Sequence, residues 1–257
     1  MTWARCRPAR AARELFLRGV VAPLIDLYVR RRQVGRDRFA KLEPPVVLAA
    51  NHSSHLDTPV ILRALPRKWR QRTAVAAAAD YFYRSRAVAA LVSLAFNTVP
   101  IDRRGQSRFG GWQDRFERLL EQRWNILFFP EGTRSRDGGI GPMRLGAARL
   151  ATDQRVPLVP VHVEGTHTAM PPGRSWPRRL RGRLWPRRHA VTVHFGEPIR
   201  PDPERNPNHV MTRLRAFMEE HAVGPLEGRD GAIPPSGGVA GQTVELEAGA
   251  GRSLEVS

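Results

Sequence analysis

The twelve residues "VVLAANHSSHLD" (46–57) join an unbroken apolar run to a polar segment. A short run of this kind, without alternating polar positions, is typical of a strand buried on both faces of a sheet. The polar segment carries His52, His55 and Asp57 at the place where that strand ends. The stretch therefore predicts a core strand that leads into a turn with candidate catalytic or metal-binding side chains.

Similar apolar runs recur along the chain, separated by segments of helical length and periodicity. The other predicted strands are residues 73–79, 97–101, 125–129, 156–163 and 190–195. Predicted helices begin after Asp57 and cover residues 81–96, 111–123, 142–154 and 207–221. Strands that alternate with helices predict an α/β fold, a mainly parallel or mixed sheet flanked by helices. In such a sheet, functional side chains gather at the carboxyl ends of the strands.

The first 40 residues predict a basic, amphipathic helical segment. Its apolar part, "LFLRGVVAPLIDLYV" (15–29), contains Arg18, Pro23 and Asp26 and is too short to span a bilayer. Two interpretations are open: the helix lies in a membrane interface with its arginines at the headgroups, or it covers the protein's own core. Residues 41–221 are predicted to form the main domain, and residues 222–257, glycine-rich and without aromatic side chains, a flexible tail.

The chain is strongly basic. Its 257 residues carry 42 Lys and Arg against 24 Asp and Glu, a formal net charge of +18. This excess indicates an anionic partner: nucleic acid, an acidic lipid surface or a phosphorylated substrate. No helix-turn-helix, zinc-finger spacing or RNP-like aromatic block is evident, so we do not expect a nucleic-acid partner. Cys6 is the single cysteine, which excludes an intramolecular disulfide and a cysteine-based metal cage.

His52 and Asp57 have the spacing of a general base and its orienting carboxylate. A carboxylate on one imidazole nitrogen fixes the tautomer and stabilises the imidazolium formed when the other nitrogen takes a proton. Taken alone, the pair also fits ordinary loop polarity with a helix cap. A metal-dependent hydrolase is a remote alternative, in which His52, His55 and Asp57 would need distant ligands such as His162, His167 or His194.

Three further stretches follow strand ends or form strands. "FFPEGTRSR" (128–136) presents Glu131 and Arg134, and an arginine there suits bidentate binding of a phosphate. Glu131 would orient that arginine or accept a hydrogen bond from a substrate hydroxyl. "VPIDRRG" (99–105) presents Arg103, and "VPLVPV" (156–161) is an apolar wall without a reactive group.

These four stretches, in this order, resemble the conserved blocks of the glycerolipid acyltransferase family, which includes the 1-acylglycerol-3-phosphate acyltransferases. His52 and Asp57 match its histidine and aspartate with four residues between them. The remaining matches are Val99, Pro100, Ile101 and Arg103 in the second block, Phe129 through Ser135 in the third, and Val156 through Val161 in the fourth. The resemblance covers roughly residues 10–221. Asn97 is a departure, because many members begin the second block with glycine.

The resemblance implies a glycerol-3-phosphate acyltransferase-like fold with a catalytic domain at residues 41–221. It implies transfer of a fatty acyl group from acyl-coenzyme A or acyl-carrier protein to 1-acylglycerol 3-phosphate (lysophosphatidic acid), which forms phosphatidic acid. Glycerol 3-phosphate, another lysophospholipid or a glycolipid are alternative acceptors. The co-substrate thioester is the only cofactor-like group expected, without a metal. The expected location is peripheral, on the cytoplasmic face of the cell membrane against anionic lipid; the sequence does not indicate an oligomeric state.

The resemblance also assigns roles to individual residues. His52 would be the base and Asp57 its orienting partner. The phosphate and glycerol of the acceptor would be bound by Arg103, Glu131, Gly132, Thr133 and Arg134. The acyl donor or acyl pocket would be lined by Val156, Pro157 and Pro160.

Overall fold

The computed structural model describes residues 3–78, 86–101, 111–180, 187–202, 204 and 206–222. All of these belong to one compact unit, residues 1–224. The predicted tail at 222–257 lies outside the described residues from 223 onward, as do Arg103 and Arg104.

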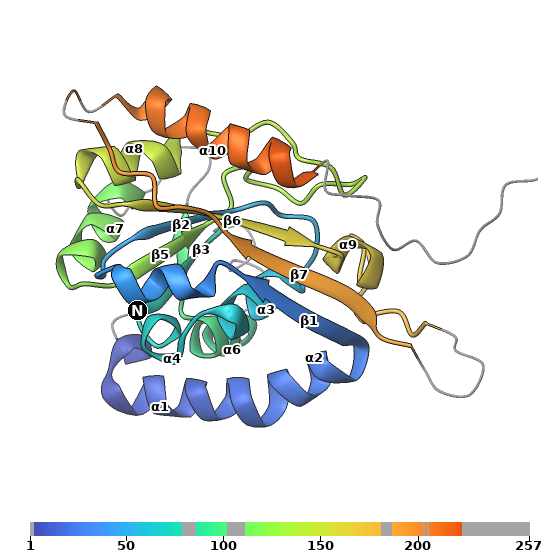
Figure 1. Cartoon of the computed structure of the whole chain (residues 1–257). Helices are drawn as coiled ribbons and strands as arrows, with labels where there is room; N and C mark the ends of the chain where they lie inside the picture. The colour runs from blue at the N-terminus through green and yellow to red at the C-terminus, as the bar shows by residue number, and fades with distance from the viewer. Residues whose placement is uncertain are drawn as a thin grey trace, which may run out of the picture. The chain divides into compact units, whose positions relative to one another are not determined.

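Within these ranges seven strands form one sheet in the order β1-β7-β6-β2-β5-β3-β4 (Figure 1). Neighbouring strands are parallel except β6 and β7, which are antiparallel. The predicted mixed, mainly parallel sheet is therefore confirmed. The strands are β1 (Val29–Val34), β2 (Val47–Ala50), β3 (Thr73–Ala78), β4 (Thr98–Ile101), β5 (Asn125–Phe128), β6 (Leu158–Glu164) and β7 (His189–Phe195).

Helices cover both faces of the sheet (Figure 1). On one face lie α1 (Arg7–Phe16), α2 (Ala22–Tyr28), α3 (Asp57–Ala64), α4 (Arg67–Arg70) and α6 (Arg86–Phe96). On the other lie α7 (Trp112–Glu121), α8 (Gly146–Asp153) and α10 (Pro207–Ala222). Shorter elements are η1 (Trp3–Arg5), the π-helical η2 (Leu17–Val21), η3 (Arg36–Lys41) and α9 (Thr166–Ala169).

The apolar residues of β2 contribute to two separate parts of the core, one on each face of the sheet. Side chains alternate between the faces of a strand. Leu48 and Ala50 of β2 accordingly belong to a cluster with α3, whereas Val47 and Ala49 belong to a second cluster with α7, α8 and α10. All four are fully buried. A strand between two helical layers needs apolar residues at every position, which is why its sequence shows no alternation.

Strand β1 was not predicted from the sequence. Its residues "VRRRQV" lie within the first 40 residues, for which the sequence predicts a helical segment, yet they pair in parallel with β7 at the edge of the sheet. Only Val29 of this strand is buried. An edge strand with charged side chains keeps other chains from pairing with it, and it lacks the apolar run that identified the central strands.

The N-terminal helical run covers the protein's own core on one side. Leu17, Ala22 and Ile25 are buried, and the buried Arg13 donates hydrogen bonds of 2.7 Å to Leu94 O in α6 and 2.6 Å to Ala4 O. Other apolar side chains of the same run face outward: Leu15, Val20, Leu24 and Leu27. No helix among the described residues is long and apolar enough to cross a membrane.

Asn97 occupies the position where many family members have glycine. Its φ angle is +52°, in the left-handed region that favours glycine and, among other residues, asparagine. Its side chain donates a hydrogen bond of 3.0 Å to Thr73 O, and its own carbonyl accepts one from Val75 N. The substitution therefore keeps the backbone conformation that glycine would allow.

Candidate active site

The site lies at the carboxyl ends of two adjacent central strands. Ala49 of β2 and Phe128 of β5 are paired in the parallel register, and His52 and Glu131 each follow three positions later. Parallel neighbours bring residues at equal offsets to the same edge of the sheet, which is why these two residues meet. The backbone N–H of His52 donates a hydrogen bond of 2.7 Å to Glu131 Oε1.

His52 and Asp57 form the predicted pair. His52 Nδ1 lies 2.8 Å from Asp57 Oδ2. The Asp57 side chain is 1% exposed, whereas that of His52 is 19% exposed. A carboxylate only accepts hydrogen bonds, so the proton of a neutral imidazole belongs on Nδ1 and the lone pair on Nε2. The ring is further held by Phe129, which stacks on it with centroids 4.0 Å apart.

Asp57 is fixed by protein donors on both oxygens. Besides His52, its Oδ2 accepts hydrogen bonds from the backbone N–H groups of Ser53 (2.7 Å) and Ser54 (2.8 Å). Its Oδ1 accepts a hydrogen bond of 2.5 Å from the hydroxyl of Thr166. Asp57 is also the first residue of α3, where the helix dipole favours a negative charge. These contacts hold the carboxylate in a fixed orientation beside the imidazole.

Glu131 is a buried bridge between two loops. Its Oε1 accepts from His52 N and its Oε2 accepts from Gly141 N at 2.9 Å. Burial raises the pKa of Glu131 above its ordinary value, although the hydrogen bonds from His52 and Gly141 act against that shift. Its visible contacts are to backbone, so its binding of substrate stays a prediction.

The turn after Glu131 holds the other predicted binding residues that the structure describes. Gly132 has a φ of +71°, and a Cβ there would lie 3.2 Å from Arg144 Nε, so glycine suits both the turn and the guanidinium above it. Thr133 is exposed. Ser135 N donates a hydrogen bond of 2.8 Å to His52 O, which ties this turn to the histidine.

Arg134 is a half-buried cation with unused hydrogen-bonding capacity. Its Nη1 is buried without a partner among the described residues. Loss of solvent, followed by the positive charges of Arg134 and His52, lowers the pKa of His55. Arg134 therefore lies near His55 and His52, where a bound anion would satisfy its free N–H.

Two predicted wall residues do not reach the site. Leu158 pairs with Val47 at the amino end of β2, and Val156 and Pro157 precede Leu158. They therefore lie near the amino ends of the central strands, whereas His52 follows the carboxyl end of β2. There Val156 packs in the core, and Pro157 O accepts a hydrogen bond from Val47 N. Their predicted role in lining an acyl-donor or acyl pocket stays a prediction. Pro160 is buried within β6, opposite Ala49.

Sequence reasoning missed three contributors: Asn51, Thr166 and Arg144. Asn51 exchanges two hydrogen bonds with the backbone of Val163, from Val163 N (2.7 Å) and to Val163 O (3.0 Å), which joins the His52 turn to β6. Thr166 follows the carboxyl end of β6. The expectation that functional side chains gather at the carboxyl ends of strands, which pointed to His52, could also have pointed to Thr166. Arg144 follows no strand and carried no such signal.

The residues proposed for a metal site do not converge. Among the described residues no group of three or more histidine, cysteine, aspartate or glutamate side chains is arranged to hold a metal ion. Asp57 instead accepts four hydrogen bonds from protein donors. His162 and His194 lie together with His221, on β6, β7 and α10.

The mixed sheet and the histidine–aspartate pair on a strand-end turn define an α/β protein with a candidate general-base site. Comparison with known proteins gives the family: residues 30–164 match the family model named Acyltransferase, and the chain belongs to that family.

Relatives and a solved structure agree with this assignment. A chloroplastic 1-acyl-sn-glycerol-3-phosphate acyltransferase of Brassica napus is 29% identical over 143 residues, 54% of this chain and 38% of its own. One from Chlamydomonas reinhardtii is 26% identical over 79% of this chain and 56% of its own. The chain thus spans less than two thirds of these relatives. The crystal structure of the 1-acyl-sn-glycerophosphate (LPA) acyltransferase PlsC from Thermotoga maritima has a similar fold, with a TM-score of 0.56, 21% identity, and coverage of 87% of this chain and 85% of that one.

Proposed function

We propose that this protein transfers a fatty acyl group from a thioester donor, acyl-coenzyme A or acyl-carrier protein, to the free hydroxyl of 1-acylglycerol 3-phosphate. The observation that carries the proposal is the 2.8 Å contact between His52 Nδ1 and the buried Asp57, which leaves Nε2 as the accepting nitrogen. The names of the relatives support the choice of acceptor.

In the proposed reaction His52 acts first as base and then as acid. His52 Nε2 takes the proton of the acceptor hydroxyl while the oxygen of that hydroxyl attacks the carbonyl carbon of the thioester. The electrons of the carbonyl double bond move onto the carbonyl oxygen. Collapse of this tetrahedral intermediate breaks the carbon–sulfur bond, and the departing sulfur takes the proton from His52. Asp57 stabilises the imidazolium between the two steps, and such acid–base catalysis contributes about 10²–10⁴-fold in rate.

Arg134 supports a phosphorylated acceptor. Its buried Nη1 has no partner among the described residues, and it lies on the same turn that Ser135 ties to His52. A phosphate on the acceptor would satisfy this donor with a charge-assisted hydrogen bond. The residues of the turn would then fix the distance between the phosphate and the hydroxyl that is acylated.

We also propose that the protein works at a membrane surface. Its acceptor and product would be amphiphiles, and four apolar side chains of the η2–α2 run and the end of α1 are exposed, with Leu15 at 75%. Exposed apolar side chains beside arginines are typical of helices that lie in the interface of a bilayer.

The test is acyl transfer from radiolabelled acyl-coenzyme A to lysophosphatidic acid, glycerol 3-phosphate and lysophosphatidylcholine. We expect lysophosphatidic acid to be preferred and His52→Ala to lose about 10²–10⁴-fold of the rate. His209→Ala is the matched control, because His209 is exposed on α10. Full activity of His52→Ala would overturn the mechanism, and preference for one of the other acceptors would overturn the substrate assignment.

A further inference from the structure

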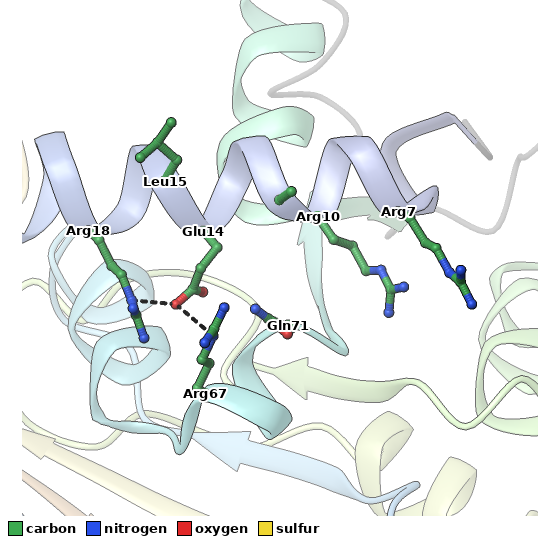
Figure 2. A pocket seen from close by; sticks show the side chains of 8 residues that line it. Arg7, Arg10, Glu14, Leu15, Arg18, Arg67 and Gln71 are labelled. Atoms are coloured by element: carbon green, nitrogen blue, oxygen red, sulfur yellow. Dashed lines mark ion pairs between the residues drawn. The ribbon is translucent and has the colours of Figure 1, made fainter.

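One face of the helical run formed by α1 and η2 carries a cluster of charges that the proposed reaction does not use. Arg7, Arg10, Glu14 and Arg18 follow one another at intervals of three or four residues, so they share one side of the helix. Figure 2 shows Glu14 and Arg18 close to Arg67 of α4, with Arg7 and Arg10 further along the same side of the helix, while Leu15 points the other way. Together with Ala11, Leu15, Arg67 and Gln71 they line a cavity of about 400 Å³.

The charges in this cavity are unbalanced. Glu14 is the single carboxylate in its lining, and it is shared by Arg70 (2.6 Å), Arg18 (2.7 Å) and Arg67 (3.9 Å). Among the described residues neither Arg7 nor Arg10 has a carboxylate partner. Arg67 keeps 62% of its side chain exposed. Several guanidinium groups therefore converge on one concave surface, where an anion would relieve their mutual repulsion.

The cavity adjoins an apolar stripe on the same helical run. Leu15, Val20, Leu24 and Leu27 are exposed, and Leu15 also lines the cavity. Figure 1 shows α1 and α2 along the outer edge of the protein. An arginine-lined cavity next to outward apolar side chains matches the two parts of an anionic lipid, its phosphate and its acyl chains.

We propose that this cavity binds the phosphate of an anionic phospholipid in the membrane, with Arg7 and Arg10 as its principal ligands. The proposal rests on the membrane location proposed above and adds a specific lipid class to it. The site is separate from that of the acyl acceptor, because none of its lining residues belongs to the four motifs. The apolar stripe beside it favours a lipid over a free phosphate.

The experiment compares binding of the full chain to phosphatidylcholine vesicles with and without phosphatidylglycerol, without acyl donor. We expect Arg7→Gln/Arg10→Gln to bind the mixed vesicles about 25-fold more weakly, about five-fold for each arginine removed. Binding to pure phosphatidylcholine should change little. The control pair Arg213→Gln/Arg215→Gln removes the same charge from exposed positions of α10, on the other face of the sheet, and should bind as wild type.

Two further measurements distinguish binding in the cavity from binding to a diffuse positive surface, and binding of a lipid from binding of free phosphate. Soluble dihexanoyl phosphatidylglycerol should bind the wild type saturably and compete with the vesicles, whereas inorganic phosphate at equal concentration should compete weakly. Equal losses in both variant pairs, or no loss in Arg7→Gln/Arg10→Gln, would overturn the proposal. Equal competition by inorganic phosphate would show an anion site and not a lipid site. Since no acyl donor is present, these outcomes are independent of whether the acyltransferase proposal holds.

Discussion

The hydroxyl of Thr166 donates a hydrogen bond of 2.5 Å to Asp57 Oδ1, the carboxylate oxygen that does not contact His52. Thr166 is fully buried just after β6, and Asp57 begins α3, so the contact joins segments 109 residues apart. It fixes the rotation of the carboxylate, and with it the direction in which Oδ2 meets the imidazole. Thr166 is in this sense a positioning residue for His52.

Replacing Thr166 by valine should therefore slow acyl transfer without weakening substrate binding. Valine has nearly the same shape but no hydroxyl, and a hydrogen bond to a charged group contributes about 1.5–3 kcal/mol. We expect kcat to fall about ten-fold or more, KM for the acceptor to stay the same, and Thr166→Ser to recover most of the rate. A purely structural role predicts instead that Thr166→Ser and Thr166→Val lose activity only in proportion to their loss of thermal stability.

Arg134→Gln should weaken binding of phosphorylated acceptors selectively. Loss of one charge-assisted interaction, about 1.5–3 kcal/mol, corresponds to an increase of about 10- to 100-fold in KM for lysophosphatidic acid. The exposed Arg136, two residues further along, provides the matched control as Arg136→Gln. Steady-state kinetics with lysophosphatidic acid and lysophosphatidylcholine measures the difference. Equal effects on both acceptors would contradict a phosphate-binding role.

Glu131→Gln should destabilise the protein as well as impair it. Both carboxylate oxygens accept backbone N–H groups, from His52 and Gly141, and an amide would turn one acceptor into a donor that faces another donor. An unsatisfied buried group costs about 1–3 kcal/mol, which urea unfolding would measure. Glu219→Gln, at an exposed position of α10, should leave the unfolding midpoint unchanged. An unaltered midpoint in Glu131→Gln would show that these backbone contacts contribute little.

The sequence was sufficient to predict the central strands and the contact between His52 and Asp57, for a physical reason. β2 and β5 are covered on both faces, so their apolar runs are unbroken, and the turn that follows β2 is short enough for His52 and Asp57 to meet locally. β1 was missed because an edge strand with one buried residue has no such run.

Contacts between distant segments could not be predicted without the register of the strands. Thr166 reaches Asp57 only because β6 pairs with β2. The same pairing places Val156 and Pro157 near the amino end of β2, away from His52. A motif shared with a family marks conserved residues without saying at which end of a strand each lies. The distance of Val156 and Pro157 in the "VPLVPV" block from His52 could therefore not be predicted from the sequence.

The last prediction concerns stability in acid and rests on His162. Burial, followed by the charges of His221 and His194, lowers the pKa of His162 from 6.5 to about 4, and its Nδ1 is buried without a partner among the described residues. Because the unfolded chain binds a proton more readily than the folded one, this histidine stabilises the fold fully above pH 6.5 and loses that contribution as pH falls toward 4. Within that window it should lower the free energy of unfolding by about 1.4 kcal/mol per pH unit. Urea unfolding across the window should show a shallower pH dependence for His162→Gln than for the wild type. His209→Gln, at an exposed position of α10, should follow the wild type, and parallel pH profiles for wild type and His162→Gln would contradict the assignment.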